Sequence, residues 1–152
     1  MNKNNVNKIV TGESIENGNL VIWTFRPELP SVDIMKKFPL LTVITWDYDG
    51  KKFEGMPERN INELMIELEN QIKPLNHEVC TQVYSRKGNN LKELVYYIND
   101  RNEFIKNVKE VLKDKPKYPV EINFYDDPKW EDYIKILEQF NSNQIKLTNG
   151  SN

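Results

Sequence analysis

The chain has 152 residues, enough for one domain with a substantial core and too few for two ordinary domains. Charged residues make up 29% and hydrophobic residues 38%, and the net charge of -2 gives no general attraction to nucleic-acid phosphates. The sequence holds no apolar run of the ~20 residues that a membrane span needs, and no apolar core of a signal peptide near its start. We therefore expect a cytoplasmic protein with one domain over residues 1–140 and a polar, disordered tail over residues 141–152.

The first predicted elements are strands. Residues 20–25 form a short apolar segment, and Pro27 and Pro30 end any pairing beyond it. Residues 40–48 are almost continuously apolar and rich in β-branched side chains. This pattern is typical of a central strand that is buried on both faces.

A helix and a hairpin follow. Pro57 opens the helix and Pro74 closes it, and one apolar face runs along it through Ile61, Leu64, Met65, Leu68 and Ile72. Residues 79–84 and 91–98 read as two strands, joined by the Gly- and Asn-rich link 86–90.

The last third of the chain predicts a helix, a strand and a closing helix. Asp100 is a helix cap with Glu103 three residues on, and residues 120–124 alternate between apolar and polar side chains. Asp127 can cap the closing helix, and Pro128 suits its first position. The inward-facing residues of this helix are Trp130, Tyr133, Ile134, Leu137 and Phe140.

From residue 40 to residue 125 the predicted order is β, α, β, β, α, β. This is the ferredoxin-like pattern of an α+β protein, in which two crossover helices cover one face of a four-stranded antiparallel sheet. Right-handed crossovers place the first and third strands of the unit side by side, with the fourth beside the first. The strand at residues 20–25 and the C-terminal helix at residues 130–140 are additions to this unit.

Several short motifs occur in the order found in one bacterial family: Phe38-Pro39, Trp46-Asp47-Tyr48, Gly55-Met56-Pro57, the Gly88 hairpin, Tyr96-Tyr97-Ile98-Asn99-Asp100, Tyr118-Pro119 and Asp126-Asp127-Pro128-x-Trp130-x-x-Tyr133. Over residues 23–137 the chain resembles domain-of-unknown-function family 695, and the last motif is the most specific. The resemblance implies a compact α+β domain related to the regulator of ribonuclease activity B, a non-catalytic inhibitor of an RNA-degrading enzyme. It brings no catalytic residues. Members of such families also occur among immunity proteins of polymorphic bacterial toxins.

The residues that could carry chemistry have simpler structural interpretations. His77 is the only histidine and precedes a strand, where a surface or turn role is expected. Cys80, the only cysteine, lies within a strand, which indicates a buried small hydrophobe and rules out an internal disulfide. Asp126 and Asp127 could act as paired carboxylates, but a helix cap already accounts for one of them. We expect no catalytic residue, metal or cofactor.

Aromatic side chains suggest a second functional possibility. By alternation we expect one face of the sheet, opposite the crossover helices, to carry Trp46, Tyr48, Tyr84, Tyr97 and Tyr125. Such a face could stack the bases of RNA, or the C-terminal helix could cover it as core. RNA binding also needs clustered positive charge, and the four arginines are scattered along the sequence.

The prediction is therefore a non-enzymatic immunity protein that binds and neutralises a cognate toxin, a basic nuclease. Acidic side chains would hold such a partner, and the candidates are Asp47, Asp49, Glu54, Asp126 and Asp127. The first three and the last two should lie at opposite ends of antiparallel strands, so one binding surface would use one group only. A regulator of a housekeeping ribonuclease would need the same kind of surface, and an adjacent toxin gene would separate the two cases.

Overall fold

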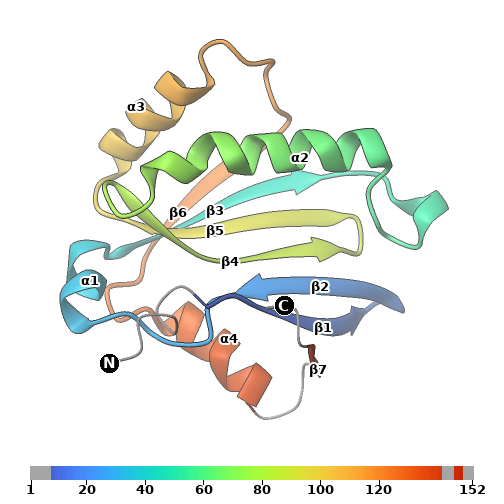
Figure 1. The fold of residues 1–152 in the computed structure, drawn as a ribbon, viewed down its shortest axis with the longest axis horizontal. Helices are drawn as coiled ribbons and strands as arrows, with labels where there is room; N and C mark the ends of the chain where they lie inside the picture. Colours follow the sequence, from blue (N-terminus) through green and yellow to red (C-terminus); the bar gives the residue numbers. More distant parts are fainter. Residues whose placement is uncertain (1–7, 142–145, 149–152) are drawn as a thin grey trace.

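The computed structural model describes residues 8–141 and 146–148, which form a seven-stranded antiparallel sheet with helices on both faces (Figure 1). Across the sheet the strands are ordered β6-β3-β5-β4-β2-β1-β7. The strands are β1 (Val10–Glu16), β2 (Asn19–Phe25), β3 (Leu40–Asp47), β4 (Cys80–Gly88), β5 (Leu91–Ile98), β6 (Glu121–Asp126) and β7 (Lys146–Thr148). The helices are α1 (Val32–Lys37), α2 (Arg59–Ile72), α3 (Arg101–Leu112) and α4 (Glu131–Asn141), with short 3-10 turns η2 (Lys51–Phe53) and η3 (Lys73–Leu75).

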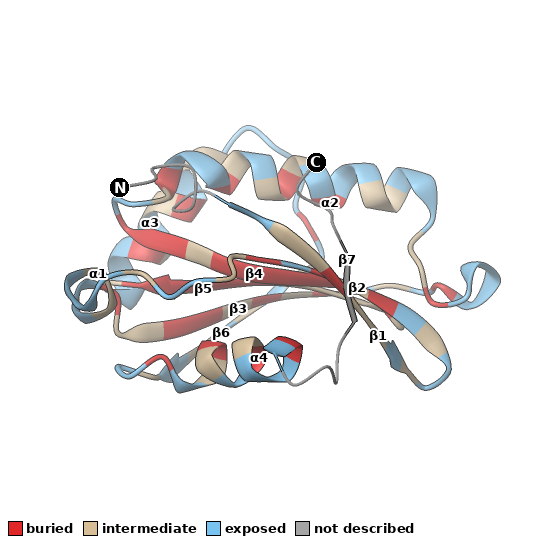
Figure 2. Ribbon diagram, turned by 60° about the horizontal axis from the view of Figure 1, so that its bottom comes forward, coloured by how far each residue is buried: buried red, intermediate tan, exposed pale blue. Residues whose placement is uncertain are grey.

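Strands β6-β3-β5-β4 are the predicted ferredoxin-like unit. β3 and β5 lie side by side with Val43 opposite Val95, and β6 pairs with the other edge of β3, with Asn123 opposite Val43. Helices α2 and α3 connect strands of this unit and cover the same face of the sheet (Figure 2). The α+β, ferredoxin-like fold predicted from the sequence is confirmed.

The sheet separates two hydrophobic clusters. We call its two sides the α2/α3 face and the α4 face, after the helices that cover them (Figure 2). On the α2/α3 face the cluster includes Ile44, Trp46, Met65, Leu68, Leu94, Tyr96 and Phe104. On the α4 face it includes Trp23, Phe25, Tyr84, Val95, Tyr97, Trp130 and Tyr133.

The predicted single aromatic face does not exist. Trp46 and Tyr48 belong to the cluster under α2 and α3, whereas Tyr84 and Tyr97 belong to the cluster under α4. Alternation orders the side chains within one strand, but only the register between strands decides which faces coincide. Of the five aromatic residues, only Tyr125 is largely exposed, at 53%.

Helix α4 covers the aromatic residues of its own face. The indole N–H of Trp130 donates to the Phe38 carbonyl at 2.9 Å, and its ring stacks on Tyr97 with centroids 4.0 Å apart. The Tyr133 hydroxyl donates to the Arg26 carbonyl. Trp130, just before the helix, and Tyr133 within it are buried, so the expected packing of the C-terminal helix on the sheet is correct.

The start of α4 differs from the prediction in one respect. The Asp127 carboxylate accepts hydrogen bonds from the backbone N–H groups of Glu131 and Asp132, at 2.9 and 3.1 Å, so it caps the helix as expected. Pro128, however, lies in a turn, and the helix begins only at Glu131. Between Pro128 and Glu131, Trp130 has a left-handed φ of 58°, and its side chain is buried in the core.

The sheet extends beyond the predicted unit through a hairpin of β2 with β1, a strand that the sequence did not predict. Gly12 in β1 lies against α4: a Cβ atom there would be 1.9 Å from the Phe140 ring. Only glycine allows this close approach. Residues 141–152, the tail predicted to be disordered, contain the short strand β7, which pairs with β1. Residues 142–145 and 149–152 of this tail lie outside the described residues.

Turns and caps fix the remaining boundaries. The β4-β5 hairpin closes on Asn89 and Asn90, whose φ values of 52° and 67° suit a two-residue turn. Asp100 caps α3 by accepting the Glu103 N–H at 2.8 Å, as predicted. Helix α2 begins at Arg59, slightly after the predicted start. Among the described residues no helix combines the length and the apolar character that crossing a membrane requires.

Candidate functional site

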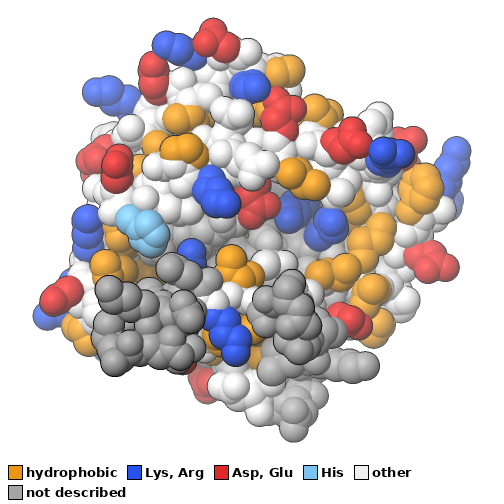
Figure 3. Space-filling model, in the orientation of Figure 1, with side chains coloured by type: hydrophobic (Ala, Val, Ile, Leu, Met, Phe, Trp, Pro, Cys, Tyr) orange, Lys and Arg blue, Asp and Glu red, His pale blue; other side chains and the backbone are white. Residues whose placement is uncertain are grey.

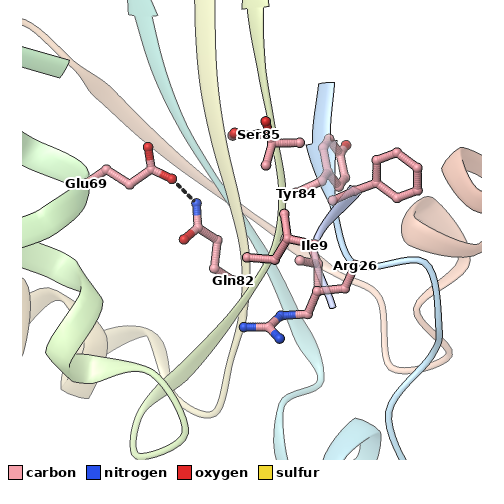
Figure 4. Close-up of a pocket in the computed structure, with 9 residues that line it drawn as sticks. Ile9, Arg26, Glu69, Gln82, Tyr84 and Ser85 are labelled. Carbon is pink, nitrogen blue, oxygen red and sulfur yellow. Dashed lines mark hydrogen bonds between the residues drawn. The ribbon is translucent and has the colours of Figure 1, made fainter. Parts of the chain in front are cut away.

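A small pocket lies between α2 and strands β2 and β4 (Figure 4). Glu69 of α2 accepts a hydrogen bond from the Gln82 side-chain amide at 2.6 Å, and Ser85 and Arg26 line the same space. Its volume is about 90 Å³. Ligand pockets are typically several times larger, so this pocket suits a few water molecules rather than a substrate.

A larger groove of about 390 Å³ lies between the 26–34 segment, β4 and the start of α4. Val83, Trp130 and Tyr133 contribute apolar lining, and His77 also lines the groove. His77 is exposed in a turn, as expected, and its backbone makes the hydrogen bonds there: its N–H donates to the Cys80 carbonyl at 2.7 Å. The groove does not pair His77 with a carboxylate through a hydrogen bond among the described residues.

Cys80 is fully buried, and burial raises the pKa of its thiol to about 12. The thiolate that a nucleophile or a metal ligand requires is therefore disfavoured at neutral pH. The predicted role as a small core residue agrees with this environment. Within the described part of the chain, no group of three or more His, Cys, Asp and Glu side chains is arranged to hold a metal ion.

The α4 face is acidic where α4 does not cover it. One row of side chains crosses four adjacent strands there: Glu121 of β6, Thr45 of β3, Glu93 of β5 and Arg86 of β4. Adjacent strands are about 4.8 Å apart, so Glu121 and Glu93 are separated by roughly 10 Å. Asp47 lies two residues beyond Thr45 on the same face.

Arg86 neutralises part of this row. Its guanidinium donates two hydrogen bonds to the Glu16 carboxylate, at 3.1 and 2.8 Å, and lies over the Trp23 ring at 5.4 Å. Among the described residues of β1 to β6 that point to the α4 face, Arg86 is the one basic side chain. Because Arg86 is paired with Glu16, the carboxylates of Glu93, Glu121 and Asp47 leave an excess of negative charge on this face.

The pKa of Glu93 depends on its burial and on these neighbouring charges. Burial raises the pKa of Glu93, Arg86 lowers it, and the negative charges of Asp132, Glu16 and Asp47 raise it further. The Asp132 carboxylate, in the first turn of α4, accepts the Tyr84 hydroxyl at 2.9 Å. We call Glu16, Asp47, Glu93, Glu121 and Asp132 the acidic surface; these residues come from four strands and one helix.

Of the predicted site residues, only Asp47 belongs to the acidic surface. Asp49 accepts the Lys51 N–H at 3.0 Å, which is the local turn role that aspartate often has. Glu54 is exposed in the same loop, where Lys51 and Lys52 balance the charge of the two carboxylates. The loop as a whole is therefore not acidic.

Asp126 and Asp127 lie at the opposite end of the sheet, as the antiparallel strands predicted. Leu40, at the start of β3, is opposite Asp126, whereas Asp47 is at the end of that strand. Asp126 is exposed, and Asp127 is occupied by the α4 cap and by the Tyr97 hydroxyl, which donates to it at 2.6 Å. The structure therefore brings neither of them to the acidic surface.

Sequence reasoning missed Glu16, Glu93, Glu121 and Asp132. Each lies at an alternating or helical position with no motif around it, and their proximity depends on the register of β5 with β3 and of β3 with β6. The one signal in the sequence was the pair of charged residues Lys92 and Glu93 inside an otherwise apolar strand, of which Glu93 points to the α4 face. A carboxylate there indicates an incompletely covered part of the sheet.

A family model described as "Family of unknown function (DUF695)" matches residues 13–138. The chain belongs to this family. The matched region runs from β1 into α4, so it contains the whole acidic surface and the α4 cap. No match was found among curated proteins or among solved structures.

Proposed function

We propose that this chain is a non-enzymatic protein-binding module that neutralises a basic protein toxin, of the nuclease class, by covering it with the acidic surface. The observation that carries the proposal is the row Glu121, Thr45, Glu93 with Asp47 beside it, on a part of the sheet that α4 leaves open. Nuclease surfaces that hold phosphates are basic, and a complementary acidic surface both steers and orients such a partner.

The geometry favours protein binding over chemistry in the groove and in the pocket. In the larger groove, no hydrogen bond among the described residues joins His77 to a carboxylate, and the buried Cys80 thiol has a raised pKa. The acidic surface, in contrast, has exposed carboxylates at Asp47 and Glu121, and its members are spread over several strands. This suits contact with a large basic surface.

An RNA-binding role has less support. It rested on aromatic side chains that share one exposed face, and Trp46, Tyr84 and Tyr97 are instead buried on two opposite faces. The acidic surface would also repel a phosphate backbone.

The resemblance of the motifs to family 695 implies a relation to the regulator of ribonuclease activity B, and such a relation supports the same kind of partner. A regulator of that type binds an RNA-degrading enzyme without cleaving anything itself. We therefore extend the proposal to a nuclease target in general, and the gene context decides between a toxin and a cellular enzyme. A toxin gene directly beside this one supports immunity, and an isolated gene supports the cellular regulator.

The test is co-expression in bacteria with the C-terminal domain of the protein encoded by the adjacent gene. Growth and co-purification are compared for the wild type, for the double variant Asp47→Lys/Glu121→Lys and for the control Glu63→Lys/Glu110→Lys. The control changes the net charge equally but lies on α2 and α3, where both carboxylates are exposed. We expect rescue by the wild type and the control and loss of rescue by the first variant.

Two results would overturn the proposal. One is a partner that neither associates with the wild-type chain nor loses toxicity in its presence. The other is equal rescue by both charge variants, which would place the binding surface elsewhere.

A further inference from the structure

Strand β6 forms an open edge of the sheet. It pairs with β3 from Asp126 opposite Leu40 to Glu121 opposite Thr45, and no register shift interrupts the pairing. It is the first strand in the order of the sheet, so its second side has no neighbouring strand among the described residues. No proline lies inside it.

The unpaired backbone groups of this edge can be named. The Asp127 N–H donates to the Pro39 carbonyl at 3.1 Å. In an antiparallel ladder, every second residue points its backbone N–H and C=O toward the neighbouring strand, so this bond shows which residues of β6 face β3. The backbone groups of Tyr125, Asn123 and Glu121 therefore point toward β3. Those of Ile122, Phe124 and Asp126 point outward, and in the described chain no hydrogen bond reaches them.

The two flanks of the edge differ in chemistry. Toward the α4 face it presents Glu121, Asn123 and the half-exposed Tyr125, next to the acidic surface. Toward the α2/α3 face it presents Ile122 and Phe124, which are only partly buried under α3. A strand added here would place alternate side chains beside these two different flanks.

We propose that β6 accepts an extended segment of a protein partner by strand addition, and that this segment alternates basic residues beside Glu121 and apolar residues beside Ile122 and Phe124. The proposal rests on the proposed function, since it supplies the binding mode for the basic partner. Main-chain hydrogen bonds to the outward groups give affinity, and the alternation of charge and apolar surface gives specificity.

The charge argues for a basic partner and against a second copy of this chain. Two copies joined antiparallel along the full length of β6, with Phe124 of one copy opposite Phe124 of the other, would place Glu121 of each copy opposite Asp127 of the other, where like charges repel. A basic segment meets the same carboxylates with opposite charge.

The test uses a synthetic nine-residue peptide that alternates lysine and valine, with a glutamate–valine peptide of the same length as the charge control. Binding is measured by calorimetry, and amide exchange is followed residue by residue by NMR. We expect the lysine peptide to bind, to slow the exchange of the Ile122 and Phe124 amides, and to bind at least tenfold more tightly than the glutamate peptide.

Ile122→Pro removes one outward N–H, and Ile122→Ala loses the same packing but keeps that N–H. Asp126→Pro and Asp126→Ala form a second pair at an exposed position, in case the first proline prevents folding. We expect each proline variant to bind the lysine peptide at least tenfold more weakly than its alanine control. Equal affinity within a pair or unchanged exchange at β6 would overturn strand addition, and a dimer in sedimentation that Ile122→Pro dissociates would overturn the assignment of this edge to a basic partner.

The same variants distinguish this failure from failure of the proposed function. If the Ile122→Pro and Asp126→Pro variants rescue growth as well as their alanine controls do, while Asp47→Lys/Glu121→Lys does not, the acidic surface binds the partner without strand addition. If the charge variant also rescues growth, the proposed function fails as well.

Discussion

The Tyr97 hydroxyl donates a hydrogen bond to the Asp127 carboxylate at 2.6 Å, and so ties the end of β5 to the cap of α4. The same carboxylate accepts the N–H groups of Glu131 and Asp132. One side chain therefore fixes both where α4 begins and how it lies on the sheet. Loss of this carboxylate removes a cap and leaves the part-buried hydroxyl unpaired.

Asp127→Ala should lower the free energy of unfolding by about 2–4 kcal/mol, the sum expected for a lost cap and a lost buried hydrogen bond. Urea denaturation gives this difference. The neighbouring variant Asp126→Ala is the control, because that side chain is exposed, and it should change stability by less than about 0.5 kcal/mol. Equal effects of the two variants would contradict the role assigned to Asp127.

Gly12 should not tolerate alanine. The added methyl group would lie 1.9 Å from the Phe140 ring, so α4 or β1 must shift, and overpacking of this kind costs about 1–3 kcal/mol. Phe140→Leu reduces the side chain and should recover part of the loss in the double variant. A thermal unfolding cycle of the two single variants and the double variant measures this coupling, and strict additivity would show that the contact is unimportant.

The stability should depend on the ionisation of Glu93. Burial raises its pKa, Arg86 opposes this, and the charges of Asp132, Glu16 and Asp47 add to it. Because the folded pKa lies above the unfolded one, the folded chain binds the proton more tightly. The free energy of unfolding should therefore fall as the pH rises from the unfolded pKa of Glu93 to its folded pKa, and it should stay lower above the folded pKa.

Glu93→Gln removes this titration. The variant should be more stable than the wild type at pH 7, and the advantage should vanish below the ordinary glutamate pKa of about 4.3. Thermal unfolding between pH 4 and pH 7.5 measures the difference. A variant that is less stable at pH 7 would mean that the attraction of Arg86 outweighs burial.

The ion pair of Arg86 with Glu16 should be sensitive to geometry as well as charge. The guanidinium donates two hydrogen bonds to one carboxylate and lies over the Trp23 ring, which a lysine cannot reproduce. Arg86→Lys should destabilise the chain by about 1–3 kcal/mol, measured by urea denaturation. The matched control Lys113→Arg alters an exposed pair with Glu110 and should have almost no effect.

The local patterns of the sequence predicted the ferredoxin-like unit well, because each strand and helix carries its own periodicity and cap. Asp100 and Asp127 were recognised as caps for this reason, and Trp130 as a core residue. The strand β1 was missed because its alternation is weak. Gly12 within it is required only by the approach of Phe140, which is distant in sequence.

The candidate site was much less predictable than the fold. Asp47 was identified from a turn, but Glu93 and Glu121 meet it only through the register of three strands. That register also placed Trp46 and Tyr97 on opposite faces, against the prediction. Surfaces that are assembled across a sheet depend on long-range pairing, which single-strand patterns do not encode.

The most direct test of the central claim is carboxyl footprinting of the chain, alone and in complex with the C-terminal domain encoded by the adjacent gene. A carbodiimide and an amine label exposed Asp and Glu side chains, and mass spectrometry gives the labelling rate of each. We predict slower labelling of Asp47, Glu93 and Glu121 in the complex, with Glu63 and Glu110 unchanged. Protection of Glu63 and Glu110 with no change at the other three would contradict the account.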